Sequence, residues 1–87
     1  MSEFLFTETG FEHYLYWQSQ DRKTLRRINA LLRSIEREGA MNGIGKPEPL
    51  RHKAGEFSRR IDEANRLVYE IEQGRIVIKS CKGHYES

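Results

Sequence analysis

An amphipathic helix between Asp21 and Gly39 is the strongest structural signal in the sequence. Its apolar side chains recur at spacings of three and four residues: Leu25, Ile28, Leu32 and Ile35. Asp21 can cap the start of this helix, and Gly39 can end it. A helix with one apolar side packs that side against a second layer, so the rest of the chain must supply a partner surface.

Strand-like runs in the second half of the chain supply that surface. They cover residues 57–61, 66–71 and 75–81 and are separated by short polar turns, which predicts an antiparallel meander. Glu3 to Thr7 reads as an opening strand, and Thr7 or Thr9 can cap a first helix. The sequence therefore predicts one α+β domain over residues 1–87, in the order β-α-α-β-β-β-β. We expect a small antiparallel sheet with two N-terminal helices packed on one face.

The aromatic residues of the predicted first helix are open to two interpretations. Phe11, Tyr14, Leu15 and Trp17 recur at helical spacing. Aromatic side chains in such a pattern usually pack inward, so we expect them in the core. A platform on which RNA bases stack is the functional alternative.

Composition excludes several classes of protein. Hydrophobic residues form 37% of the 87-residue chain and charged residues 32%, without repeats or Pro/Gly/Ser tracts, so we expect a folded domain. No apolar run is long enough to span a bilayer, and the acidic start lacks the basic region of a signal peptide, which favours a cytoplasmic protein. The single cysteine, Cys81, excludes an internal disulfide and a cysteine-based zinc site. We expect it to be a buried strand residue, with a catalytic thiolate as the alternative.

Charge is distributed unevenly along the chain. Residues 1–20 contain three Glu and no Lys or Arg, whereas residues 21–87 hold all fifteen basic residues. Arg22, Arg26, Arg33 and Arg37 form one stripe opposite the apolar side of the predicted second helix. The stripe is either an ordinary solvated surface or a surface that follows an RNA backbone, and the pattern favours neither.

Three further positions could carry chemistry. Arg60 and Arg66 should lie side by side on neighbouring strands, which is unfavourable unless an anion lies between them, so a phosphate site is plausible. Glu48 lies between two prolines that restrict its backbone, and it could act as a general base. His84 follows the last strand, where it is either solvated or catalytic. Exposed strand arginines and an exposed loop glutamate are the alternatives.

The loop around Lys46 does not match a nucleotide-binding loop, because the Gly-x-x-x-x-Gly-Lys-Ser/Thr pattern is absent. We keep Lys46 as a candidate contact to an RNA backbone. The spacing of His84 from His13 and His52 matches no metal site, so we expect no metal or other cofactor.

Several segments together resemble the YoeB (Txe) family of bacterial toxins, within the RelE-like superfamily. They are residues 45–52 (GKPEPLRH), 57–61 (FSRRI), 65–69 (NRLVY) and 81–85 (CKGHY), and their order and spacing match as well. The segment 14–18 (YLYWQ) is also similar, so the resemblance covers nearly the whole chain. Phe57 stands where the family usually has tryptophan, and Lys82-Gly83 replaces a basic-aromatic pair.

The resemblance implies a RelE-like microbial ribonuclease fold and the toxin of a type II toxin-antitoxin system. Such toxins are metal-independent mRNA interferases that cut mRNA in the ribosomal A site by attack of the 2′-hydroxyl group. It implies Glu48 as base, His84 as acid, Arg66 and Arg60 as phosphate ligands, and Tyr85 as an orienting residue. Arg51, with Lys46, Arg22 and Arg26, would contact RNA. The implied partners are a YefM-like antitoxin, the 70S ribosome, mRNA and a second copy of the chain.

Two other functions remain open from the sequence. A non-catalytic module could use the same basic surface to bind nucleic acid or the ribosome. The gyrase-poisoning branch of the superfold is a second alternative, but it generally lacks the glutamate and the terminal His-Tyr pair that are present here.

Overall fold

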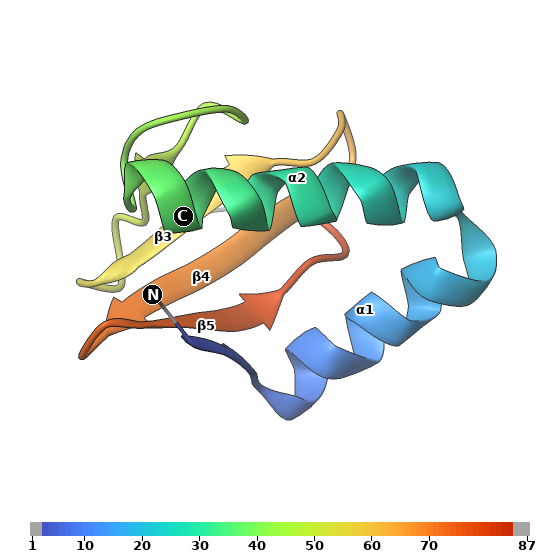
Figure 1. Cartoon of the computed structure of the whole chain (residues 1–87), viewed down its shortest axis with the longest axis horizontal. Coiled ribbons are helices and arrows are strands. Elements are labelled where there is room, and N and C mark those ends of the chain that lie inside the picture. Colours follow the sequence, from blue (N-terminus) through green and yellow to red (C-terminus); the bar gives the residue numbers. More distant parts are fainter. Residues whose placement is uncertain (1–2, 85–87) are drawn as a thin grey trace.

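The computed structural model describes residues 3–84, and its elements follow the predicted order. They are β1 (Glu3–Phe6), α1 (Glu8–Gln20), α2 (Arg22–Glu38), β2 (Glu48–Pro49), β3 (Glu56–Arg60), β4 (Arg66–Glu72) and β5 (Arg75–Ser80). Both helices cover the same face of the sheet (Figure 1). The α+β prediction is therefore confirmed.

The sheet has the strand order β1-β5-β4-β3-β2. Strands β2 to β5 are antiparallel, as predicted, because short connections join each to the next. Strand β1 runs parallel to β5, with Phe4 opposite Ile76, so the sheet is mixed rather than wholly antiparallel. The reason is that β1 and β5 are far apart in the chain, and no hairpin turn imposes an antiparallel direction on them.

Helix α2 packs its apolar side on the sheet and forms most of the core. Ile28, Leu31 and Ile35 are almost completely buried in one cluster with Leu67 and Ile78 of the sheet. The predicted caps are present. Asp21 Oδ1 accepts hydrogen bonds from the backbone N–H groups of Lys23 and Thr24, at 3.1 and 3.3 Å. Gly39 ends the helix with a φ of 94°, a value that favours glycine.

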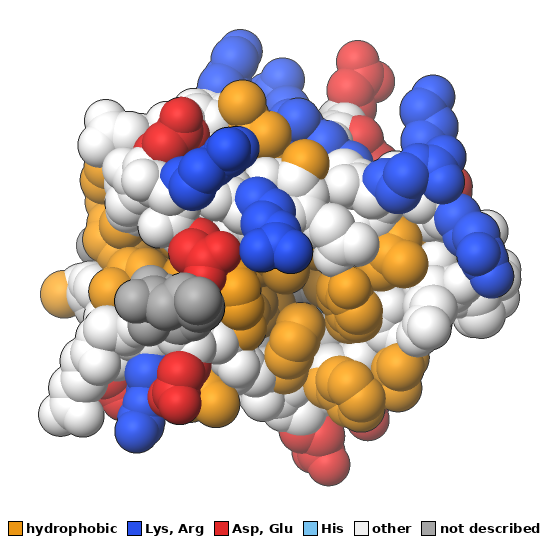
Figure 2. Space-filling model, in the orientation of Figure 1, with side chains coloured by type: hydrophobic (Ala, Val, Ile, Leu, Met, Phe, Trp, Pro, Cys, Tyr) orange, Lys and Arg blue, Asp and Glu red, His pale blue; other side chains and the backbone are white. Residues whose placement is uncertain are grey.

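Helix α1 lies at the edge of the sheet and is buried only in part. Gly10 is buried against β5, where an added Cβ would lie 2.3 Å from the Ile78 carbonyl oxygen, so only glycine allows this close approach. Tyr14 and Trp17 pack on the core as predicted. The prediction is wrong for Phe11 and Leu15, which are 49% and 44% exposed. The Phe11 ring still meets the Phe6 ring of β1, with 6.0 Å between centroids, and Figure 2 shows hydrophobic side chains gathered over this part of the molecule.

Within residues 3–84, no helix has both the length and the apolar character that a membrane crossing requires.

Candidate active site on the open face of the sheet

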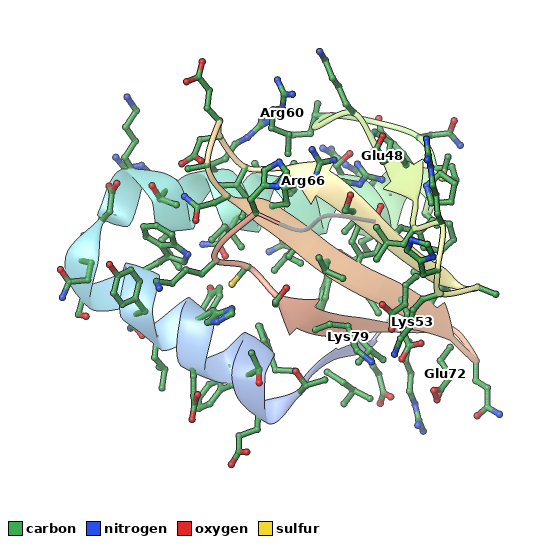
Figure 3. The ribbon with its side chains drawn as sticks, turned by 180° about the vertical axis from the view of Figure 1, so that it is seen from behind. Glu48, Lys53, Arg60, Arg66, Glu72 and Lys79 are labelled. Atoms are coloured by element: carbon green, nitrogen blue, oxygen red, sulfur yellow. The ribbon has the colours of Figure 1, made fainter. Side chains whose placement is uncertain are left out.

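The face of the sheet turned away from the helices brings Glu48, Ser58 and Arg66 together. Glu48 of β2 lies opposite Ser58 of β3, and Arg66 of β4 lies opposite Arg60, so these side chains share one face. Arg66 Nη2 donates to Glu48 Oε1 at 3.0 Å. Arg66 Nε and Nη2 also donate to Ser58 Oγ, at 3.2 and 3.0 Å. Figure 3 shows Glu48 and Arg66 on this open face, viewed from the side of the sheet opposite the helices.

The three side chains differ in their contact with solvent. Ser58 is only 1% exposed, the side chain of Arg66 is 13% exposed, and that of Glu48 is 61% exposed. Arg66 is therefore held on the side of the sheet by the buried Ser58 hydroxyl group. On the side of the solvent it contacts the accessible Glu48 carboxylate. A ligand that approaches from solvent reaches Glu48 and the outer part of Arg66 first.

Arg60 contributes a second guanidinium at this end of the sheet. It lies directly opposite Arg66 in the register of β3 and β4, as the sequence predicts. Its backbone N–H donates to the Gly45 carbonyl at 2.7 Å, and its carbonyl accepts from Arg27 Nη2 at 3.1 Å. The backbone of Arg60 is thus fixed on both sides while its side chain stays exposed. Lys46, also exposed, follows Gly45 in the adjoining loop.

A second charged group on the same face is neutralised internally. Lys79 Nζ lies 3.2 Å from Glu56 Oε2 and 3.8 Å from Glu70 Oε1. The hydrogen bond to Glu56 raises the pKa of Lys79 above its usual value, against the opposing effect of burial. Lys79 is therefore a cation already balanced by carboxylates, which leaves Arg60 and Arg66 as the arginines suited to an added anion.

The chain returns to Arg66 after β5 and brings His84 to the same end of the sheet. The backbone N–H of Arg66 donates to the Gly83 carbonyl at 3.0 Å, and the Gly83 N–H donates to Asn65 Oδ1 at 2.8 Å. His84 is the next residue and is exposed. Tyr85 lies outside the described residues.

Cys81, just before this segment, is anchored on helix α1. Trp17 Nε1 donates to the Cys81 carbonyl at 2.8 Å, and the Cys81 N–H donates to His13 Nδ1 at 3.1 Å. The Cys81 thiol is fully buried, and this burial raises its pKa to about 12. Cys81 is buried as predicted, although it directly follows β5 rather than lying within a strand. A thiol with this pKa is a poor source of thiolate.

The remaining predicted RNA contacts lie elsewhere. Arg22 and Arg26 are exposed on α2, which covers the opposite face of the sheet from Arg66. Arg51 is exposed just after β2. Within residues 3–84, no group of three or more His, Cys, Asp or Glu side chains is arranged to hold a metal ion.

Three residues of structural consequence were not singled out from the sequence. Ser58 supports Arg66, Asn65 binds Gly83, and Arg59 is completely buried on the helix-covered face. Strand alternation carried part of this information, because it places Ser58 beside Arg60 and turns Arg59 inward. The Asn65 contact had no local signal, since its partner lies 18 residues away.

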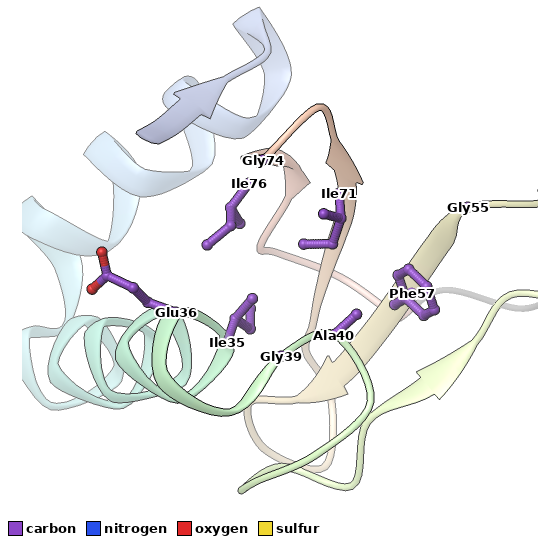
Figure 4. Close-up of a pocket in the computed structure, with 9 residues that line it drawn as sticks. All are labelled: Ile35, Glu36, Gly39, Ala40, Gly55, Phe57, Ile71, Gly74 and Ile76. Atoms are coloured by element: carbon purple, nitrogen blue, oxygen red, sulfur yellow. The ribbon is translucent and has the colours of Figure 1, made fainter. Parts of the chain in front are cut away.

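An apolar hollow of about 350 Å³ lies on the helix-covered face (Figure 4). It is lined mainly by Ile35, Phe57, Ile71 and Ile76, with Glu36 as its only ionisable residue. A single carboxylate offers neither an acid-base pair nor a cation. The open face, rather than this hollow, therefore holds the groups suited to acid-base chemistry.

The open-face group has the components of acid-base catalysis on an anionic substrate. A carboxylate can take a proton, guanidinium groups can balance charge that builds up on phosphate oxygens, and an imidazole can donate a proton. A planar guanidinium offers two parallel N–H donors to a phosphate, which a lysine cannot do.

Comparisons with known proteins identify the family of this chain. Residues 6–85 match a family described as the YoeB-like toxin of bacterial type II toxin-antitoxin systems. The chain is 46% identical over 82 residues to Toxin YoeB of Synechocystis sp., which covers 93% of this chain and 94% of that protein.

Solved structures extend the agreement to the whole fold. A YoeB dimer from Staphylococcus aureus is 47% identical with a TM-score of 0.92, over 97% of this chain and 98% of that one. A heterotetrameric YoeB-YefM toxin-antitoxin complex from the same species is 46% identical with a TM-score of 0.89, over 98% and 99% of the chains. The chain therefore belongs to the family of YoeB-like toxins of bacterial type II toxin-antitoxin systems.

Proposed function

We propose that this toxin is a metal-independent endoribonuclease that cuts mRNA during translation. The observation that carries the proposal is the contact of Glu48 with Arg66, supported by Ser58 and placed opposite Arg60. It joins a carboxylate to two guanidinium groups at an accessible sheet face, and the chain bearing His84 returns to the same place.

Each residue has one task in the proposed reaction. Glu48 takes the proton of the 2′-hydroxyl group, and the 2′ oxygen attacks the neighbouring phosphorus. The bond from phosphorus to the 5′ oxygen breaks, and His84 gives that oxygen a proton. The products are a 2′,3′-cyclic phosphate and a 5′-hydroxyl end, so no water is consumed in the step. Arg66 and Arg60 balance the charge of the crowded phosphate.

The contact of Glu48 with Arg66 suits this sequence of events. Arg66 can turn its outer N–H groups from Glu48 to the phosphate while Ser58 still holds Nε. The carboxylate is then released at the point where the 2′-hydroxyl group arrives. Tyr85 orients the substrate or His84, and Lys46, Arg51, Arg22 and Arg26 contact the RNA backbone.

The proposed partners follow from the family. Relatives of this chain occur in a YoeB-YefM complex and in a YoeB dimer. We propose that this toxin binds a YefM-like antitoxin, which displaces its C-terminal residues, and that it acts on mRNA in the A site of the 70S ribosome. A homodimer is the proposed form of the free toxin.

A translation extract tests the activity directly. Purified toxin is added to a bacterial extract that translates a defined mRNA, and new 5′ ends are mapped with and without ribosomes. Wild-type protein should cut only translated mRNA and leave cyclic phosphate ends. Glu48→Gln should lower the rate about 10²- to 10⁴-fold, the usual cost of losing a general base. Glu72→Gln, an exposed carboxylate at the far end of β4, is the matched control.

Two results would contradict the proposal. Full cleavage by the Glu48→Gln protein would remove Glu48 from the reaction. Inhibited translation with intact mRNA would instead indicate a module that binds the ribosome without cutting.

A further inference from the structure

The turn between β3 and β4 is organised around Asp62. Its Oδ1 accepts from the backbone N–H groups of Ala64 and Asn65, both at 2.8 Å. The Asn65 side-chain Nδ2 donates to both Asp62 carboxylate oxygens, at 3.1 and 3.2 Å. The amide of Asn65 is therefore oriented by Asp62, because its nitrogen faces the carboxylate and its oxygen must face the other way.

That oxygen receives the backbone of the C-terminal segment. Asn65 Oδ1 accepts from the Gly83 N–H at 2.8 Å, and the Gly83 carbonyl accepts from the Arg66 N–H at 3.0 Å. Both backbone polar groups of Gly83 are thus bound, one to Asn65 at the end of the turn and the other to Arg66, the first residue of β4. Gly83 has a φ of 94°, and an added Cβ would meet nothing within 4 Å, so glycine is required by the backbone conformation and not by space.

We propose that Asn65 is a positioning residue that sets where His84 is presented to Glu48 and Arg66. We call the chain of contacts from Asp62 through Asn65 to Gly83 the turn latch. The role of His84 rests on the proposed function, whereas the latch itself rests on the hydrogen bonds of Asp62, Asn65 and Gly83. His84 directly follows Gly83, so the direction in which it leaves is set by the residue that the latch holds.

The other anchors of this segment do not reach His84. Trp17 and His13 bind the backbone of Cys81, two residues before Gly83. Lys82 lies over the Tyr16 ring, with Nζ 4.7 Å from its centroid, and is otherwise exposed. Without the Asn65 contact, Gly83 would keep only the bond to Arg66 among the described residues, and glycine offers little resistance to backbone rotation.

Geometry is the reason why this small contact matters for rate. A general acid must lie within about 2.6 to 3.2 Å of the atom that it protonates. A displacement of about 1 Å can lower a rate on the order of 10²-fold. The latch contacts are exposed, so their loss should shift His84 without disturbing the core.

The decisive variants alter the latch in two ways. Asn65→Ala removes the side-chain hydrogen bonds to Asp62 and the hydrogen bond to Gly83. The double variant Asp62→Asn with Asn65→Asp exchanges the carboxylate and the amide, and it keeps an acceptor for Gly83 and a hydrogen bond within the turn. Asn42→Ala is the matched control, because it removes another exposed amide that binds one backbone carbonyl, that of Glu38, on the loop after α2.

Two measurements are made on the whole protein. Hydrogen exchange of the Gly83 amide, followed by NMR, reports the latch whether or not the protein is an enzyme. Cleavage of translated mRNA as a function of pH reports the acid. Asn65→Ala should speed Gly83 exchange at least tenfold and lower kcat about 10- to 100-fold, with KM within about twofold. In the profile of cleavage rate against pH, the limb that reports the pKa of the general acid should differ from that of the wild type. The double variant with exchanged residues should recover most of the cleavage rate.

The outcomes separate the inference from the proposed function. Unchanged Gly83 exchange in Asn65→Ala would overturn the latch, and faster exchange with an unchanged rate and pH profile would overturn the positioning role. An equal loss of rate in Asn42→Ala, or no recovery in the double variant, would also overturn it. If wild-type protein cuts no RNA, the proposed function and the positioning of an acid both fail, while Gly83 exchange still decides whether the latch exists.

Discussion

Arg59 and Arg66 lie on neighbouring strands of one sheet but face opposite sides of it. Arg59 points toward the helices and is fully buried. Its Nε donates to the Tyr69 hydroxyl at 2.9 Å, its Nη1 to Ser34 Oγ and the Ile44 carbonyl, and its Nη2 to the carbonyls of residues 39 and 42. Arg66 points to the open face, and its side chain donates only to Ser58 and the exposed Glu48 within residues 3–84.

The difference separates an arginine whose donors are all bound internally from one that is accessible to a ligand. Arg59 gathers the loop after α2 around one guanidinium, and every nitrogen of that group is already bound. Arg66 Nη1 makes none of the hydrogen bonds found within residues 3–84, and one partner of Nη2 is a carboxylate in contact with solvent. A guanidinium can bind an added phosphate only where its donors can change partner, so burial decides which arginine is available.

The largest expected effect is the loss of stability in Arg59→Met. The substitution leaves several buried carbonyl and hydroxyl groups without a donor, each at a cost of about 1 to 3 kcal/mol where water cannot replace it. We expect the free energy of unfolding to fall by roughly 4 kcal/mol, a large part of the total for a domain of this size. Urea denaturation measures it. Arg60→Met, the exposed neighbour, should cost less than about 0.5 kcal/mol. Similar losses for both variants would mean that burial does not make Arg59 structurally special.

Arg66→Lys should show the opposite profile. It keeps the positive charge but loses the planar pair of donors, so we expect mRNA cleavage to fall about 10²- to 10³-fold. The free energy of unfolding should change by less than about 1 kcal/mol. Arg75→Lys is the matched control, because Arg75 on β5 also contacts a glutamate, Glu3 of the edge strand β1, at 3.2 Å. An unfolded Arg66→Lys protein would show that both arginines are structural.

Ser58→Ala should lower cleavage by a smaller factor. It removes the acceptor that holds Arg66 Nε and Nη2, and a hydrogen bond to a charged group contributes about 1.5 to 3 kcal/mol. We expect a loss of about 10- to 100-fold. In the Arg66→Lys background the same substitution should cost little, since the contact is already gone. Additive losses in the double variant would mean that Ser58 acts independently of Arg66.

The smallest expected effect concerns His13, which anchors the Cys81 backbone behind the open face. Burial, followed by the nearby Lys82, lowers the pKa of His13 below 6.5. Its neutral form is favoured in the folded state, so its contribution to stability is fully present above pH 6.5 and is lost as the pH falls through the lowered pKa. Thermal unfolding should show a modest loss of stability on acidification in this range. His13→Asn keeps an acceptor for Cys81 but does not titrate, so an unchanged pH dependence in that variant would assign the loss to other groups.

Local sequence patterns predicted much of the fold and part of the site. The spacing of Leu25 to Ile35 predicted α2, and Asp21 and Gly39 marked its ends correctly. Strand alternation predicted that Arg60 and Arg66 would be neighbours on one face. These features depend on residues close together in the chain, or on two strands joined by one short turn, so their physical cause is contained in a short segment.

Contacts between distant segments could not be predicted in the same way. The parallel pairing of β1 with β5, the exposure of Phe11 and the burial of Arg59 among carbonyls of the loop after α2 all depend on how whole elements pack. The same holds for Asn65 and Gly83. The sequence by itself determined the elements, their order and which acidic, basic and histidine side chains are candidates for the site. Only the tertiary structure decided which arginine is bound internally and which is left to meet a ligand, because burial and hydrogen-bond partners are properties of the packed chain.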